Sequence, residues 1–386
     1  MSYIHKVIFY PVDNGDTTQI VLSQGRRILF DFCDRGQTKD QPEQAFNLSA
    51  HIRDELKKTG RNFFDVVAFT HADLDHIQGS TEFFELWHAK KYQGEERIKI
   101  RELWVPAAML LEKTDHEHQQ EEFVILRQEA RHRLLEGKGI RVFSKPDSLM
   151  DWLRPQLEAR HENASARDHL FVDAGTLVPG FSLDHDGIEF FCHSPFIKHC
   201  DSGSIIRNQA SLVLNVRFLT DGGVCDYLEV GDATWEEIED IVRISKRHNN
   251  EDRLAWDLYN IPHHCSYLSL NESGQKGDIE TDPKPLVKEL LLKGKRGAYI
   301  VSCSKAIPDT SRSYKQDQPP HIQARHTYER YLNRVGGRKF LVTMEEPSID
   351  NPEPIVFEIS NAGVVLKRSV SLGAPAILTS TPPRAG

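Results

Sequence analysis

The chain has 386 residues, of which 39% are hydrophobic, and its formal net charge is −9. This length and apolar content are enough to bury one large core or two smaller ones. The mean hydropathy of −0.49 and the lack of an apolar run near 18 residues exclude a transmembrane helix. The acidic balance argues against broad, nonspecific binding to duplex DNA, although it leaves room for a local basic groove.

Strands and helices alternate in the predicted first half. We predict strands at 5–12, 18–23 and 27–32, a helix at 42–59 and a short buried strand at 63–69. A helix at 80–90, a strand at 97–105 and helices at 115–136 and 146–160 follow. Basic and apolar residues alternate at 97–101, a pattern that favours a half-exposed edge strand. A basic surface that binds nucleic acid stays open as the alternative.

The predicted second half returns to strands. They fall at 187–192, 210–218, 225–230, 256–261 and 298–303, with helices at 235–246 and 322–332. The polar segments 271–285 and 312–320 predict loops. Residues 338–368 indicate a β-hairpin or short strands, and 374–386 have the composition of a disordered tail.

The N-terminus and the cysteines favour a cytoplasmic location. The first residues lack the charged and apolar regions of a signal peptide. The six cysteines form no CxxC pair, so we expect reduced thiols rather than a disulfide framework. We therefore expect a cytoplasmic protein that makes no membrane contact.

Four metal-ligand side chains follow the strand at 63–69 within six residues. They are His71, Asp73, Asp75 and His76. Because they come directly after a buried strand, we expect them in a loop at the edge of a sheet. Imidazole and carboxylate groups at this density suit divalent metals. The alternative is an acidic turn with incidental histidines, and the further ligand-like residues downstream favour the metal.

The segment from His71 to His76 resembles the HxHxDH signature of the metallo-β-lactamase superfamily, with Asp73 in place of the second histidine. This HxDxDH form is typical of the branch related to the nuclease domain of the DNA-uptake protein ComEC. Further motifs of that branch appear in the expected order: Gly15-Asp16, a strand ending at Asp31, Asn208-Gln-Ala-Ser-Leu-Val-Leu, Gly231-Asp232, Pro262-His263-His264-Cys265-Ser266, and a strand at 298–302 followed by His321. The resemblance spans about residues 5–335 and indicates a soluble, stand-alone form.

The resemblance implies an α/β fold, the αββα metallo-β-lactamase sandwich, over residues 1–337. A helical insertion would occupy about 88–170, and 338–373 would form a β extension packed on the domain. The insertion could lie over the active site as a lid or form an outer helical layer without substrate contact. The sequence leaves both alternatives open.

The resemblance also implies two divalent metal ions. His71 and Asp73 would hold one, while Asp75, His76 and one histidine of the pair at 263–264 would hold the other, with Asp232 bridging them. The ions would share a hydroxide whose pKa falls toward neutrality. The oxygen-rich ligand set favours Mn²⁺, with Zn²⁺ or Mg²⁺ as alternatives.

Roles for the two adjacent histidines are less defined. We assign His263 to the metal and His264, with Asp75 and Asp232, to catalysis, although the sequence does not decide which histidine is the ligand. We expect Asn208, Ser266 and His321 to bind substrate, while Ser266 could equally cap its turn.

Several neighbouring residues complete the expected site. Asn208 stands where many members of the superfamily have a histidine, and His193 or His199 could substitute for it. Asp31 and Asp16 could orient the metal-binding histidines. Cys265 replaces a glycine of the motif, where glycine could serve a positive φ or the close approach of a substrate, and the cysteine suggests a slightly different turn.

The sequence therefore predicts a metal-dependent hydrolase, in the first place a phosphodiesterase or nuclease acting on nucleic acid or a nucleotide. A small-molecule hydrolase of nucleotides or esters is the first alternative, because this fold supports many reactions. A metal-binding subunit of a multi-protein system, such as a defence system, is the second. It would be active only in complex and would dock through the insertion or the C-terminal extension.

Overall fold

The computed structural model describes residues 4–35, 46–94, 96–112, 121–200, 205–273 and 278–367. The start of the helix predicted at 115–136 and the predicted tail at 374–386 lie outside these residues. No helix in the described ranges is long and apolar enough to cross a membrane.

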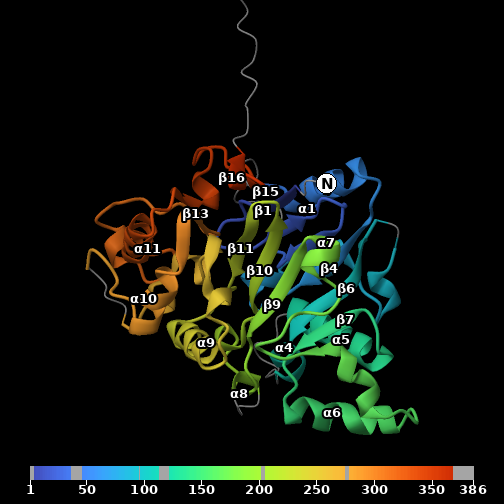
Figure 1. The fold of residues 1–386 in the computed structure, drawn as a ribbon. Coiled ribbons are helices and arrows are strands. Elements are labelled where there is room, and N and C mark those ends of the chain that lie inside the picture. The colour runs from blue at the N-terminus through green and yellow to red at the C-terminus, as the bar shows by residue number, and fades with distance from the viewer. Residues whose placement is uncertain are drawn as a thin grey trace, which may run out of the picture.

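Two β-sheets form the centre of the molecule (Figure 1). The strands of the first are β1 His5–Phe9, β2 Thr18–Val21, β3 Arg27–Phe30, β4 Phe63–Ala68, β5 Phe84–Glu85, β6 Ile98–Pro106, β7 Ile140–Phe143, β8 Phe171–Val172, β15 Ile355–Ser360 and β16 Gly363–Lys367. Their order is β16-β15-β1-β2-β3-β4-β6-β7-β8, with β5 paired to β6. Strands β3, β4, β6, β7 and β8 are parallel, so their carboxyl ends lie at one edge.

The second sheet is built from the second half of the chain. Its strands are β9 Ile188–Ser194, β10 Val213–Thr220, β11 Gly223–Glu229, β12 Trp256–Asn260, β13 Gly294–Ser302 and β14 Lys339–Val342. They are ordered β14-β13-β12-β11-β10-β9, and the pairs from β11 to β14 are parallel. The carboxyl ends of β11 and β12 therefore also lie at one edge.

Helices cover the outer face of each sheet. They are α1 Leu48–Lys58, α2 Leu74–Ile77, α3 Ser80–Phe83, α4 Ala107–Leu111, α5 Glu121–Glu136, α6 Asp147–Glu158, α7 Leu183–Asp186, α8 Ile197–Cys200, α9 Trp235–Arg247, α10 Pro285–Leu291 and α11 Ile322–Arg334. Figure 1 shows α5 and α6 beside β6 and β7, and α9, α10 and α11 beside the second sheet.

Three apolar clusters define the layers. One packs α1, α4, α5 and α6 on the first sheet, and another packs α9, α10 and α11 on the second. The third joins the two sheets face to face, with Phe9 and Phe30 on one side and Phe190 and Leu214 on the other. The predicted α/β architecture, with helix, sheet, sheet and helix layers, is confirmed.

Two local predictions are wrong. The helix predicted at 80–90 ends at Phe83, because the next two residues form β5 and pair with Ile98 and Lys99 of β6. The strand predicted as an edge strand, β6, lies inside the sheet between β4 on one side and β5 and β7 on the other. Its Arg101 side chain remains exposed, with the guanidinium carbon 3.6 Å from the centre of the Phe63 ring.

The C-terminal strands join both sheets. Strand β14 pairs with β13, whereas β15 pairs with β1 and carries β16 at the edge of the first sheet. In Figure 1, β15 and β16 accordingly lie next to the N-terminal strand β1.

Candidate metal centre

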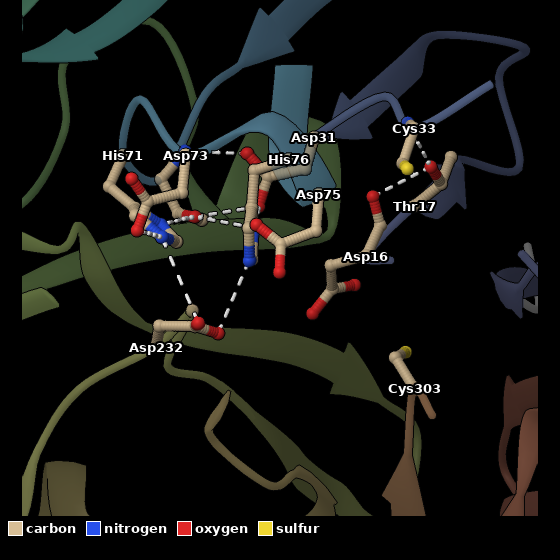
Figure 2. Close-up of polar contacts among 12 residues, drawn as sticks. Asp16, Thr17, Asp31, Cys33, His71, Asp73, Asp75, His76, Asp232 and Cys303 are labelled. Carbon is tan, nitrogen blue, oxygen red and sulfur yellow. Dashed lines mark hydrogen bonds and ion pairs between the residues drawn. The ribbon is translucent and has the colours of Figure 1, made fainter. Parts of the chain in front are cut away.

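The predicted ligands lie on three segments that follow strands. The segment after β4 carries His71, Asp73, Asp75 and His76, the last two within α2. Asp232 follows β11, and a short 3₁₀ turn after β12 carries the adjacent histidines. Figure 2 shows Asp232 facing His71 and His76 from the opposite segment.

Four of these residues form a compact group. One ligand atom from each of Asp75, His76, Asp232 and His264 lies within 4.8 Å of all the others. The Nε2 atom of His76 is 3.2 Å from Asp232 Oδ1, and the Nε2 atom of His264 is 3.2 Å from Asp75 Oδ2. This spacing suits four ligands that share one cation.

Further candidate ligands lie around Asp232 at longer distances and form a looser set. The Nε2 atoms of His71 and His263 each lie 3.8 Å from Asp232 Oδ2, and His71 Nε2 is 3.5 Å from Asp73 Oδ2. Asp232 thus directs Oδ1 toward His76, and Oδ2 lies 3.7 Å from His264 Nε2 of the compact group as well as near the looser set. A carboxylate in this position can contact a cation on each side.

The donor atoms also fit a divalent cation. Buried polar atoms normally have hydrogen-bond partners. In the part of the chain that the structure describes, His71 Nε2, His76 Nε2 and Asp232 Oδ1 are buried and make no hydrogen bond of normal geometry, although the last two lie 3.2 Å apart. Unsatisfied imidazole nitrogens and a carboxylate oxygen that converge in this way have the chemistry of a metal site.

Backbone and carboxylate groups fix the orientation of two histidines. His76 Nδ1 lies 2.7 Å from Asp31 Oδ2, and the Thr70 backbone N–H and hydroxyl also donate to Asp31. His264 Nδ1 lies 2.8 Å from the carbonyl oxygen of Cys303. A proton on Nδ1 leaves Nε2 of each ring directed toward Asp232 as a ligand atom, the usual arrangement of metal-binding histidines.

Close spacing perturbs the protonation of the group. Burial disfavours ionised Asp232, but the nearby histidines His264, His76 and His263 hold its pKa well below the ordinary value. Burial lowers the pKa of His264, but Asp232 and Asp75 outweigh it and raise that pKa to about 9. The pKa of His76 is raised in the same way by Asp232 and Asp31. The protonated histidines balance the negative charge of the carboxylates. A bound metal cation can replace these protons.

The turn that carries the two histidines is strained. His263, His264 and Cys265 have φ angles of 52°, 51° and 64°, a region that non-glycine residues rarely adopt. Such outliers occur at functional sites where the surrounding structure maintains them. The conformation at Cys265 is the one expected where the motif has glycine. The strained turn brings both imidazole rings to Asp232.

The residues predicted to bind substrate have different surroundings. Ser266 Oγ accepts a hydrogen bond from the backbone N–H of Leu268, so the hydroxyl caps its own turn. His321 Nδ1 accepts one from the backbone N–H of Tyr267, whose ring lies 4.2 Å away. Asn208 opens a 3₁₀ turn before β10.

His193 and His199 do not join the group. His193 Nε2 is 3.0 Å from the carbonyl oxygen of Arg253, and His199 Nε2 is 3.8 Å from Asp240. Neither histidine therefore substitutes for the one that Asn208 replaces.

A buried polar network lies next to the group. The Nδ2 group of Asn260 donates to Asp16 and Glu229 at 3.2 and 3.1 Å, and the Tyr227 hydroxyl donates to Glu229. The backbone N–H of Asp16 donates to the carbonyl oxygen of Asp75, which ties this network to the ligand loop. Figure 2 shows Asp16 beside Asp75. Burial, with the charge of Asp16, raises the pKa of Glu229 to about 8.

Two residues near the ligand loop were missed by the sequence analysis. Arg207 donates to Asp73 and also to Glu112, a residue of the predicted insertion. Arg207 directly precedes the Asn208 motif, so its position beside a motif was the only available signal. Nothing in the sequence around Glu112 marks it.

Comparison with known proteins gives weak similarities. No family model matches the sequence, and no curated protein matches it. Among solved structures, a putative metal-dependent hydrolase from Parabacteroides distasonis is 8% identical, with 87% of this chain and 91% of that chain covered and a TM-score of 0.32. A diphosphatase of the PhnP family is 10% identical, with 93% and 98% covered and a TM-score of 0.33. The metallo-β-lactamase SMB-1 is 13% identical, with 66% and 78% covered and a TM-score of 0.28. At these scores we draw no conclusion about activity from them.

Proposed function

We propose that the protein is a metal-dependent hydrolase of phosphodiesters, with nucleic acid or a nucleotide as its substrate. The observation that carries the proposal is the compact group of Asp75, His76, Asp232 and His264, whose ligand atoms lie within 4.8 Å of one another. The substrate class is supported by the resemblance of the HxDxDH segment and its companion motifs to the ComEC-like branch.

The four residues of the compact group would hold one divalent cation, and His71 and Asp73 would hold a second beside Asp232. Such a cation supplies Lewis acidity and lowers the pKa of bound water. Carboxylate oxygens in both sets favour Mn²⁺ over Zn²⁺, although the imidazoles also suit Zn²⁺.

The chain's own residues prepare the site for this chemistry. Asp31 and the Cys303 carbonyl oxygen orient His76 and His264. The strained turn holds His263 with its side chain 20% exposed, so this imidazole is the one that can exchange a proton with a leaving group. Burial of Asp232 and His76 keeps competing water away from the ligand atoms.

The test uses purified protein with Mn²⁺, Mg²⁺ or Zn²⁺ and a panel of bis(4-nitrophenyl) phosphate, single- and double-stranded DNA, and RNA. We expect hydrolysis by the wild type that disappears on adding EDTA and in Asp232→Ala. Asp350→Ala, which removes an exposed carboxylate, should retain it. Absence of hydrolysis of every phosphodiester with every metal would refute the proposal.

A further inference from the structure

The segment predicted as an insertion, which also supplies β6 and β7 of the first sheet, contacts the ligand loop through one arginine. Arg207 Nη1 donates to Asp73 Oδ1 at 2.7 Å and to the carbonyl oxygen of Ala72 at 3.1 Å. On its other side, Nε and Nη2 of Arg207 donate to the carboxylate of Glu112 at 2.8–3.0 Å. Glu112 is the residue at the C-terminal end of α4. One guanidinium therefore joins the predicted metal loop to the insertion.

Contacts within the insertion hold this pair in place. The guanidinium carbon of Arg207 lies 4.9 Å from the ring centre of Phe123 in α5. Also from α5, Arg127 donates to the carbonyl oxygen of Glu112 at 2.6 Å, and Arg131 donates to that of Leu110 at 2.9 Å. The end of α4 is thus fixed on α5, and Arg207 is oriented before any substrate arrives.

One hydrogen-bond donor of Arg207 remains available. A guanidinium has five N–H groups. The contacts with Asp73, Ala72 and Glu112 use the Nε–H, both Nη1 hydrogens and one Nη2 hydrogen. Among the residues that the structure describes, no acceptor is found for the second Nη2 hydrogen. The Arg207 side chain is 21% exposed, and its hydrogen bond to Asp73 places the guanidinium beside the ligand loop.

The charge of Arg207 is also suited to an anion. Burial lowers the pKa of Arg207, but the hydrogen bonds that it donates to Glu112 and Asp73 outweigh burial and raise that pKa, so the guanidinium stays charged. When Asp73 shares its negative charge with a cation, it neutralises Arg207 less. The one remaining N–H of this guanidinium suits a phosphate oxygen, which can accept a charge-assisted hydrogen bond from it.

We propose that Arg207 binds a nonbridging phosphate oxygen of the substrate, and that Glu112 holds the guanidinium in the orientation for doing so. The inference rests on the proposed phosphodiesterase function and names a substrate-binding residue for it. The insertion then contributes to substrate binding through Glu112 and Phe123 and is more than an outer layer.

The experiment titrates inorganic phosphate into Mn²⁺-loaded protein by calorimetry and measures the Mn²⁺ content of each variant. In Arg207→Ala we expect Kd for phosphate to rise about 10-fold or more, the usual effect of losing a hydrogen bond to a charged group. Arg207→Lys should recover part of the affinity, because it keeps the charge without the planar fork. The control Arg154→Ala, which removes an exposed guanidinium from α6 that pairs with Asp151, should bind phosphate like the wild type.

Kinetics give a second readout. With bis(4-nitrophenyl) phosphate, Arg207→Ala should raise KM more than it lowers kcat, at unchanged Mn²⁺ content. An unchanged phosphate Kd would overturn the inference. Loss of Mn²⁺ from Arg207→Ala would also overturn it, because Arg207 would then act only by positioning Asp73.

The two proposals fail in different ways. Hydrolysis of the diester by the wild type and equally by Arg207→Ala would refute the role of Arg207 and leave the proposed function standing. A Mn²⁺-loaded wild type that neither binds phosphate nor hydrolyses the diester would refute the proposed function, and the role of Arg207 with it.

Discussion

The Nδ1 atom of His76 lies 2.7 Å from the Oδ2 atom of Asp31, a residue 45 positions earlier in the chain. Both side chains are buried. The contact fixes the imidazole so that its Nε2 atom is directed at Asp232, 3.2 Å away. Asp31 is itself held by two hydrogen bonds from Thr70, so the end of β3 determines how the ligand loop after β4 presents its histidine.

Asp31→Asn should therefore weaken metal binding without removing a ligand. Substitutions of groups that orient a ligand typically cost 10–100-fold in metal affinity, and we expect a rise of this size in Kd for Mn²⁺ by calorimetry. Asp65→Asn is the matched control, since Asp65 lies within β4 away from the ligand loop and pairs with Arg61 and Arg101. Equal Mn²⁺ affinity in wild type and Asp31→Asn would show that the contact does not support the site.

The two adjacent histidines should differ in their effect on metal content. His264 belongs to the compact group and is oriented by the Cys303 carbonyl oxygen, whereas His263 lies 3.8 Å from Asp232 and is more exposed. We expect His264→Ala to lower the Mn²⁺ bound per chain, measured by mass spectrometry of the metal, more than His263→Ala does. The reverse order would reassign the ligand to His263, as the sequence analysis proposed.

Gly231 should tolerate no side chain. Its φ angle is 51°, and a Cβ atom there would lie 2.9 Å from both Cβ and Oγ1 of Thr70, the residue that holds Asp31. Gly231→Ala should lower the free energy of unfolding by about 1–3 kcal/mol, because it adds overlap to the strain of a positive φ. Gly60→Ala is the control, since Gly60 has a φ of 66° with open space around it. Chemical denaturation should show the larger loss for Gly231→Ala, and equal losses would contradict the predicted overlap.

Glu229 should make the stability depend on pH. Burial and the charge of Asp16 raise its pKa from the ordinary 4.5 to about 8, so the folded protein binds a proton that the unfolded chain releases. The stabilisation of the folded state by this proton is fully present below pH 4.5 and is lost as pH rises through about 8. In EDTA, the free energy of unfolding of the wild type should fall over this window relative to Glu229→Gln, which stays neutral. Parallel pH profiles of the two proteins would contradict the shifted pKa.

The ligand loop and its strand could be predicted because their signals are local. An apolar run followed by His71, Asp73, Asp75 and His76 specifies a strand and a loop within about fifteen residues, and the structure has β4 followed by α2 there. The motif order likewise placed Asp232 and the histidine turn after strands of the second sheet. The layered architecture was implied by the family resemblance, and the alternation of strands and helices is consistent with it.

The features that could not be predicted depend on contacts between residues that are far apart in the sequence. The Arg207–Glu112 pair joins residues 95 positions apart, and neither carries a local signal. Phe84 and Glu85 form a strand rather than continue a helix because they pair with the first residues of β6. The choice between His263 and His264 depends on a strained turn and on the Cys303 carbonyl oxygen, both of which only the fold supplies.

The most direct test of the proposed metal centre is a crystal structure of the Mn²⁺-soaked protein with anomalous diffraction data. We predict an anomalous peak between Asp75, His76, Asp232 and His264, within bonding distance of all four side chains. A second, weaker peak on the side of His71 and Asp73 would support a two-metal site. A fully loaded crystal with no peak among those four residues would contradict the central claim.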